Sequence, residues 1–146
     1  MDLHIEQRER EGIVILDLRG PLTLGHGDLE LRDRLPALHQ SGNINIVLNL
    51  KQVSQIDSAG LGTLVLGLAR LRKAGGRLAL VGLNRSHLEL FLLTKLAIAF
   101  ELFDDEQDAV NSFFPDREWK HFDVLNFVKQ QNRLDPGHGA VPEAAC

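Results

Sequence analysis

Apolar and polar residues alternate along the first 114 positions with two different periods. Short runs rich in Ile, Val and Leu predict strands at residues 3–7, 13–18, 44–50, 77–82 and 99–103. Between these runs, apolar residues three and four positions apart predict helices at 28–40, 59–73, 86–93 and 104–114. The connections are short, so we expect right-handed crossovers in a largely parallel sheet of about five strands. The predicted fold class is α/β.

Turn and cap residues predict where several of these elements begin and end. Glu11-Gly12 predicts a hairpin turn, and Gly20-Pro21 is expected to end the second strand. Asp28 is expected to cap the first helix. Pro36 lies inside that helix, where it removes a backbone donor, and it predicts a kink or a short final segment.

The helix predicted at 59–73 has the clearest pattern. Its core-facing stripe is expected to contain Leu61, Leu64, Val65, Leu68 and Leu71. Ala74-Gly75-Gly76 should end it. Ser86 and Glu89 have the spacing of a capping box and predict the start of the next helix. The strand at 44–50 is apolar apart from Asn45 and Asn49, which is apolar enough for burial on both faces and typical of the centre of a parallel sheet.

The chain beyond Pro115 differs in character from the part before it. A helix is predicted at 117–131, with Phe122, Leu125 and Val128 on one side. Packing on the sheet is its expected role, and formation of a homodimer or binding of a partner are alternatives. Residues from Asp135 onward have too few apolar positions for a core and are predicted to be disordered. The predicted organisation is a domain at 1–114, a helical extension at 115–134 and a tail at 135–146.

Composition and charge narrow the classes of function. The net charge is −4 and basic residues are scattered among acidic ones, so nucleic-acid binding is not expected. No apolar run reaches the roughly 18 to 20 residues of a membrane span, and the N-terminus is too polar for a signal peptide. A cytoplasmic location is therefore expected. Cys146 is the only cysteine, so no internal disulfide can form.

The segment Ile56 to Gly62 is the strongest candidate for a functional site, because a central strand turns there into a helix whose first amides lack internal partners. Asp57 or Ser58 can accept a hydrogen bond from these amides as the N-cap. The small residues Ala59 and Gly60 leave the Ser58 hydroxyl uncovered. Two interpretations follow: Ser58 is only a helix cap, or Ser58 is exposed to another protein.

A wider set of residues resembles the STAS family, which includes the anti-sigma factor antagonists. The resemblance lies in 46–50, Val53, 57–62 and 75–78. It continues through 95–97 to 100–105 and Ala109, and so covers about residues 3–114 in the order of the family.

This resemblance implies a STAS-like mixed sheet and a partner switch without a cofactor or enzymatic activity. In the family, a partner kinase that is itself an anti-sigma factor phosphorylates the serine of this motif, and a phosphatase removes the phosphate. The resemblance places the acceptor at Ser58. It also implies a partner-binding surface, formed by Asp57, Ser58, Ala59, Gly60, Leu61 and Gly62. The alternative is a STAS interaction subunit of another signalling assembly or of a transporter, in which Ser58 is only a helix cap.

Two features depart from the family pattern. Family members often carry an acidic residue in the loop after the second strand, whereas this loop reads Leu22-Thr23-Leu24-Gly25-His26-Gly27. The partner contact is therefore expected to differ there. The second departure is the predicted C-terminal helix, which lies beyond the usual end of the domain.

Three other classes of protein fit the motif less well. A serine hydrolase needs G-x-S-x-G, but Ile56 stands two positions before Ser58, and the six histidines are scattered without metal-binding spacing. No glycine-rich phosphate-binding motif is present, although nucleotide binding occurs in some STAS proteins. A receiver domain with Asp57 as acceptor would need an acidic pair after the first strand of its sheet, where the residues are Arg19-Gly20-Pro21.

Overall fold

The computed structural model describes residues 2–134. The strands are β1 (His4–Arg10), β2 (Ile13–Leu22), β3 (Asn45–Ile56), β4 (Arg77–Val81) and β5 (Glu101–Phe103). The helices are α1 (Asp28–Gln40), α2 (Ser58–Lys73), α3 (Arg85–Leu93), α4 (Glu106–Asn111) and α5 (Val124–Leu134). The tail predicted to be disordered, including Cys146, lies outside the described residues.

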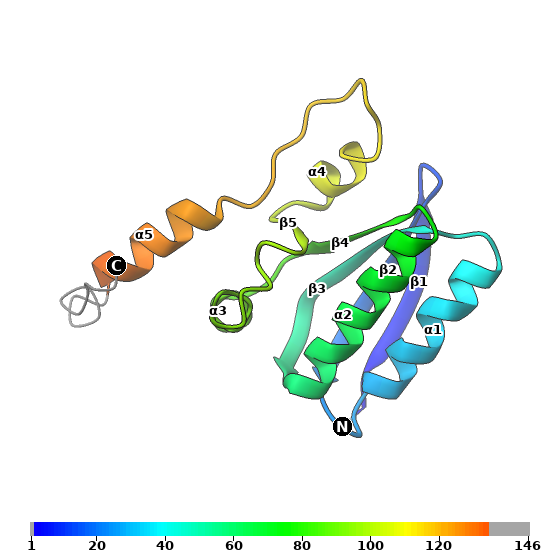
Figure 1. Ribbon diagram of the computed structural model, residues 1–146, viewed down its shortest axis with the longest axis horizontal. Helices are drawn as coiled ribbons and strands as arrows, with labels where there is room; N and C mark the ends of the chain where they lie inside the picture. Colours follow the sequence, from blue (N-terminus) through cyan, green and yellow to red (C-terminus); the bar gives the residue numbers. More distant parts are fainter. Residues whose placement is uncertain (1, 135–146) are drawn as a thin grey trace.

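The five strands form one sheet in the order β1-β2-β3-β4-β5 (Figure 1). β1 and β2 are an antiparallel hairpin, whose turn has positive φ at Glu11 (54°) and Gly12 (84°). The pairs β2–β3, β3–β4 and β4–β5 are parallel. The expected α/β class, the hairpin and the central position of the third strand are confirmed.

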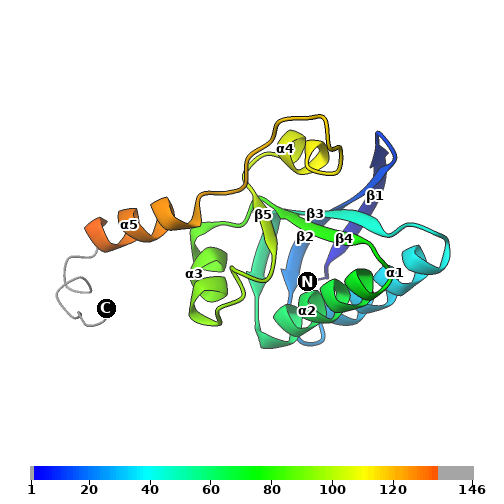
Figure 2. The ribbon, with the colours of Figure 1, turned by 45° about the horizontal axis from the view of Figure 1, so that its top comes forward.

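The helices lie on both faces of the sheet, with α1 and α2 on one face and α4 on the other (Figure 2). Side chains of β2 alternate between two buried clusters. Val14, Leu16 and Leu18 point into the larger cluster under α1 and α2, whereas Ile13 and Ile15 point into the smaller cluster under α4. This alternation is the period of two that a strand imposes, and it explains why the first four residues of β2 are all apolar.

β2 and β3 are longer than predicted, and the prediction that Gly20-Pro21 ends β2 is wrong. Two register shifts relative to β3 let β2 continue through this pair to Leu22. A bulge tolerates a proline, which has no amide proton for the ladder, and Gly20 adopts a positive φ of 112° there. Leu22 is consequently paired with Ile56, so both strands end at the same edge of the sheet.

The start of α1 also differs from the prediction. Gly27, with φ of 103°, is the N-cap residue, and Asp28 is the first residue of the helix. The buried Asp28 carboxylate accepts a hydrogen bond from the amide of Gly25 (3.0 Å) and shapes the preceding loop instead of capping the helix. The helix does not stop at Pro36, because Leu35 and Leu38 on either side of it are buried in the core, and it continues to Gln40.

The capping box predicted at Ser86 and Glu89 is wrong as well. α3 begins one residue earlier, and the side chain of Asn84 caps it by accepting a hydrogen bond from the amide of His87 (2.8 Å). Asn84 is as good a cap as serine, so residue type alone could not decide between them. β5 begins at Glu101 instead of residue 99.

The chain after α4 crosses the sheet edge in an irregular conformation before the last helix. The amide of Phe122 donates to the carbonyl of Leu102 in β5 (2.7 Å). The ring of Trp119 meets the ring of Phe103 edge-on, with 6.1 Å between the centroids. The last helix therefore starts at Val124, not at residue 117, and it points away from the sheet in both ribbon views (Figures 1 and 2). Within residues 2–134, no helix is long and apolar enough to cross a membrane.

Candidate functional site

The common end of β2 and β3 brings the loop at 23–27 against the start of α2. Asp57 connects the two segments with both carboxylate oxygens. Its Oδ1 accepts a hydrogen bond from the amide of Gly60 (3.0 Å), and its Oδ2 accepts one from the amide of Leu24 (3.0 Å). Asp57 is therefore the N-cap of α2 and holds the 23–27 loop in place. The bond to Leu24 spans 33 residues of sequence and was not predicted.

The same two amides control the charge of Asp57. Hydrogen bonds from the amides of Leu24 and Gly60 stabilise the carboxylate, and they lower the pKa of Asp57 below its ordinary value. The positive end of the α2 dipole acts in the same direction. Asp57 is consequently ionised at neutral pH and places a fixed negative charge beside Ser58.

Ser58 is the first residue of α2 and is exposed. Because the carboxylate of Asp57 supplies the cap, the Ser58 hydroxyl is not needed for capping. Within residues 2–134, the Ser58 hydroxyl takes part in no hydrogen bond. The interpretation of Ser58 as the cap of α2 is therefore wrong, and Asp57 has that role.

The two glycines of the motif have different surroundings. A Cβ atom on Gly60 would lie 2.0 Å from the carbonyl oxygen of Leu22, so only glycine lets α2 approach the end of β2 this closely. A Cβ atom on Gly62 would meet nothing within 4 Å. Tight packing accounts for Gly60, whereas Gly62 leaves a bare, exposed patch on α2.

The six residues of the predicted partner-binding surface are not equally accessible. Ser58 and Gly62 are exposed, Asp57 and Ala59 are half-buried, and Gly60 and Leu61 are buried. Only part of this set is available to a partner. Gly60 and Leu61 are buried, so they can affect a partner only by positioning α2.

An apolar groove continues from Ser58 along the outer side of α2, and we call it the Ser58 groove. It is lined by Arg32, Ser58, Leu61, Gly62, Val65, Leu66, Ala69, Thr94 and Leu96. Val65 was predicted to lie in the core, but it is 37% exposed. Leu24, on the loop held by Asp57, is 72% exposed. Exposed leucine and valine around one serine are typical of a protein-binding surface.

Sequence reasoning missed this groove, although α2 carries a signal of it. Leucine and valine at 64, 65 and 66 stand on adjacent positions of α2, so they cannot all face the core. Leu64 is fully buried, whereas Val65 and Leu66 face solvent. Arg32 comes from α1 and Thr94 is the C-cap residue that follows α3, so neither could be read from the motif.

The described residues show no arrangement that would hold a metal at this site. Within residues 2–134, no group of three His, Cys, Asp or Glu side chains is placed to bind a metal ion. What the arrangement does offer is an accessible hydroxyl at a helix start, with a carboxylate beside it and an apolar groove behind it.

Comparison with known proteins agrees with this geometry. The model of the STAS domain family matches residues 4–109. An anti-sigma F factor antagonist of Paenibacillus polymyxa is 27% identical over 110 residues, which are 75% of this chain and 94% of that protein. An anti-sigma-B factor antagonist of Bacillus subtilis (strain 168) is 29% identical over 96 residues, 66% of this chain and 86% of that protein.

A solved structure shares the fold. SpoIIAA, a Bacillus cell fate determinant determined in its phosphorylated form, has a TM-score of 0.59 and 21% sequence identity. The similarity covers 76% of this chain and 98% of that structure. The five-stranded, mostly parallel sheet with its helices is thus the architecture that this neighbour also has. The chain belongs to the STAS domain family.

Proposed function

We propose that this chain is a non-catalytic, cytoplasmic antagonist of an anti-sigma factor. It binds a serine kinase that is itself an anti-sigma factor, and phosphorylation of Ser58 by that kinase releases it. A phosphatase restores the binding form. The two curated relatives, both anti-sigma factor antagonists, support this class of partner.

A single observation carries the proposal: the cap of α2 is provided by Asp57, so the hydroxyl of Ser58 stays exposed at the end of an apolar groove. A serine that capped its own helix would lose a stabilising hydrogen bond on modification. Here the kinase can modify Ser58 without dismantling the helix start. The exposed apolar residues of the Ser58 groove supply the area that a docked partner would bury.

Electrostatics explains why phosphorylation would act on binding and not on folding. A phosphate adds about −1.5 to −2 charge at neutral pH. The helix start stabilises such a charge by about 0.3 to 1 kcal/mol, and the neighbouring carboxylate of Asp57 opposes it. The free protein should therefore keep its fold. Under a docked partner the phosphate would lose its water, at a cost of several kcal/mol.

The experiment is affinity capture from native cytosol with wild type, Ser58→Ala and Ser58→Asp as baits, read by quantitative mass spectrometry. Ser86→Asp is the matched control, because Ser86 is also exposed in the first turn of a helix, α3. We expect wild type, Ser58→Ala and Ser86→Asp to retain an ATPase of the histidine-kinase type that Ser58→Asp loses. The captured kinase, incubated with ATP, should phosphorylate Ser58.

Two outcomes would contradict the proposal. If all four baits capture the same proteins equally, Ser58 is not a switch, and the alternative of a STAS interaction subunit in another assembly is favoured. If phosphate is found only at residues other than Ser58, the assignment of the acceptor is wrong. Equal free energies of unfolding for the four baits would exclude a folding defect as the cause of lost capture.

A further inference from the structure

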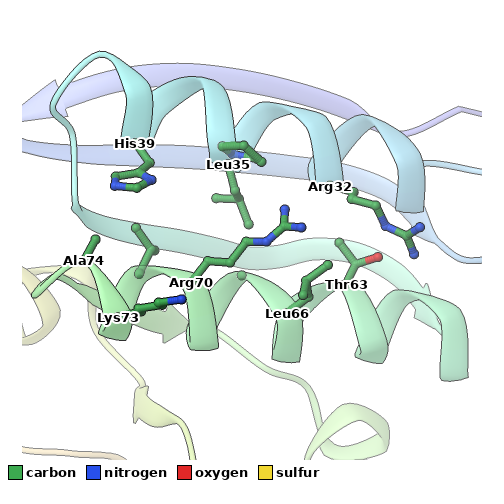
Figure 3. A pocket seen from close by; sticks show the side chains of 11 residues that line it. Arg32, Leu35, His39, Thr63, Leu66, Arg70, Lys73 and Ala74 are labelled. Atoms are coloured by element: carbon green, nitrogen blue, oxygen red, sulfur yellow. The ribbon is translucent and has the colours of Figure 1, made fainter.

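A second groove lies between α1 and α2, on the solvent side of these two helices (Figure 3). Its volume is about 460 Å³, which falls within the roughly 300 to 1,000 Å³ typical of small-molecule sites. Leu35 and Leu71 form its buried floor together with Gly67. A Cβ atom on Gly67 would lie 2.6 Å from a terminal methyl of Leu35, so this glycine is what allows the two helices to come close.

The rim of this groove is positively charged. Arg32 and His39 reach it from α1, and Arg70 and Lys73 reach it from α2. Figure 3 shows Arg70 and His39 turned toward the space between the helices. No carboxylate lines the groove, and α2 contains no Asp or Glu from Ser58 to Lys73. The concentration of positive charge is notable in a chain whose net charge is −4.

These cations have no carboxylate partner in the described structure. Within residues 2–134, none of the ion pairs includes Arg32, Arg70 or Lys73. Three obligate cations around an apolar floor repel one another. A bound anion would relieve this repulsion, and the floor would bury an apolar body at the same time.

The walls indicate what kind of apolar body fits. Leu35, Pro36, Leu66 and Leu71 are aliphatic, and the lining contains no Phe or Trp. The planar groups of the lining, His39 and the two arginines, lie at the rim, so the floor itself offers no aromatic platform for a nucleobase. An open, elongated groove lined with aliphatic side chains suits a flexible alkyl chain better than a flat ring.

We propose that the groove between α1 and α2 binds a fatty acid as a free carboxylate, with its alkyl chain on Leu35, Gly67 and Leu71 and its head group at Arg70 and Lys73. Arg32 and Leu66 also line the Ser58 groove. A bound fatty acid would therefore lie beside the partner-binding surface. The proposal does not depend on phosphorylation of Ser58.

The test is titration of the isotope-labelled full chain with laurate below its micelle concentration, followed by amide NMR and calorimetry. Laurate should shift the amides of Leu35, Gly67 and Leu71. The double variant Arg70→Gln/Lys73→Gln should weaken the affinity about tenfold, which corresponds to about 1.4 kcal/mol. Arg72→Gln/Lys129→Gln removes the same charge from outside the groove and should bind laurate as the wild type does.

Three results would overturn the proposal. Laurate could fail to bind or could shift amides far from α1 and α2. Dodecylammonium, with the same chain and the opposite charge, could bind equally well, which would mean that the cations have no role. Finally, the chain could sediment with phosphatidylglycerol vesicles but ignore free laurate, in which case the groove recognises a membrane surface.

Discussion

The contrast between Gly60 and Gly62 provides a sharp test of the site geometry. The same change to alanine, made two positions apart on α2, should have effects of opposite sign on the free energy of unfolding. A Cβ atom at 60 would lie 2.0 Å from the Leu22 carbonyl oxygen, at least 1.0 Å inside the 3.0 Å limit that real Cβ atoms respect. At 62 the added methyl meets nothing.

The magnitudes follow from this geometry. Overpacking against backbone costs about 1 to 3 kcal/mol, and the better helix propensity of alanine returns up to about 1 kcal/mol. Because the clash is with a backbone oxygen, the cost should lie at the upper end, about 2 to 3 kcal/mol, and Gly60→Ala should lose about 1 to 2 kcal/mol. It should also loosen the Asp57 bond to the 23–27 loop, because Leu22 immediately precedes that loop. Gly62→Ala should gain about 0.5 to 1 kcal/mol, since nothing opposes the propensity term.

Urea unfolding followed by circular dichroism would measure both changes. With an m-value near 2 kcal/mol/M, a difference of about 2 kcal/mol separates the two midpoints by about 1 M. If the proposed function is right, Gly62→Ala should also capture less of the proposed partner kinase than wild type does, because its methyl covers exposed surface next to Ser58. The reasoning is refuted if Gly60→Ala is as stable as wild type, or if both variants shift the midpoint in the same direction.

Three further predictions concern residues outside this pair. Asp57→Ala should lose about 1 kcal/mol at pH 7. The pKa of Asp57 is lower in the folded than in the unfolded state. The stability difference between wild type and Asp57→Ala should therefore be present above the unfolded-state pKa near 3.9 and vanish as pH falls through the folded-state pKa. Equal differences at pH 3 and pH 7 would contradict this. Burial lowers the pKa of His87, so the free energy of unfolding should fall as pH drops below about 6.5. His87→Leu should remove this pH dependence, as measured by urea titrations between pH 5 and 8. Phe122→Ala should cost about 1 kcal/mol, because Phe122 packs against the core. Leu125→Ala should leave the thermal midpoint unchanged, because Leu125 is 66% exposed; equal losses would contradict the packing of Phe122 at the sheet edge.

Local pattern was sufficient for the elements and their order. The β-branched runs at 13–18 and 44–50 impose a period of two, and the leucines of α2 impose a period near four, because backbone geometry alone sets these repeats. Short connections then limit the topology to a largely parallel sheet. Local sequence placed the motif at 57–62 at a strand-to-helix junction. It also offered two candidate caps for the helix, Asp57 and Ser58, without deciding between them.

Only the tertiary structure decided between those alternatives, because the deciding contacts join residues distant in sequence. The pairing of Leu22 with Ile56 brings the 23–27 loop to Asp57, and the amide of Leu24 then holds the Asp57 carboxylate, whose other oxygen caps α2 at the amide of Gly60. Gly60 is constrained by a carbonyl 38 positions earlier, and nothing local separates it from Gly62.

The two grooves depend on tertiary structure for the same reason. Val65 has the polarity of a core residue, and it is exposed only because α2 turns that side away from the sheet. The positive groove combines residues of α1 with residues of α2. Periodicity reports which face of a helix is apolar, but packing determines which neighbours that face meets and which positions stay open to a ligand or a partner.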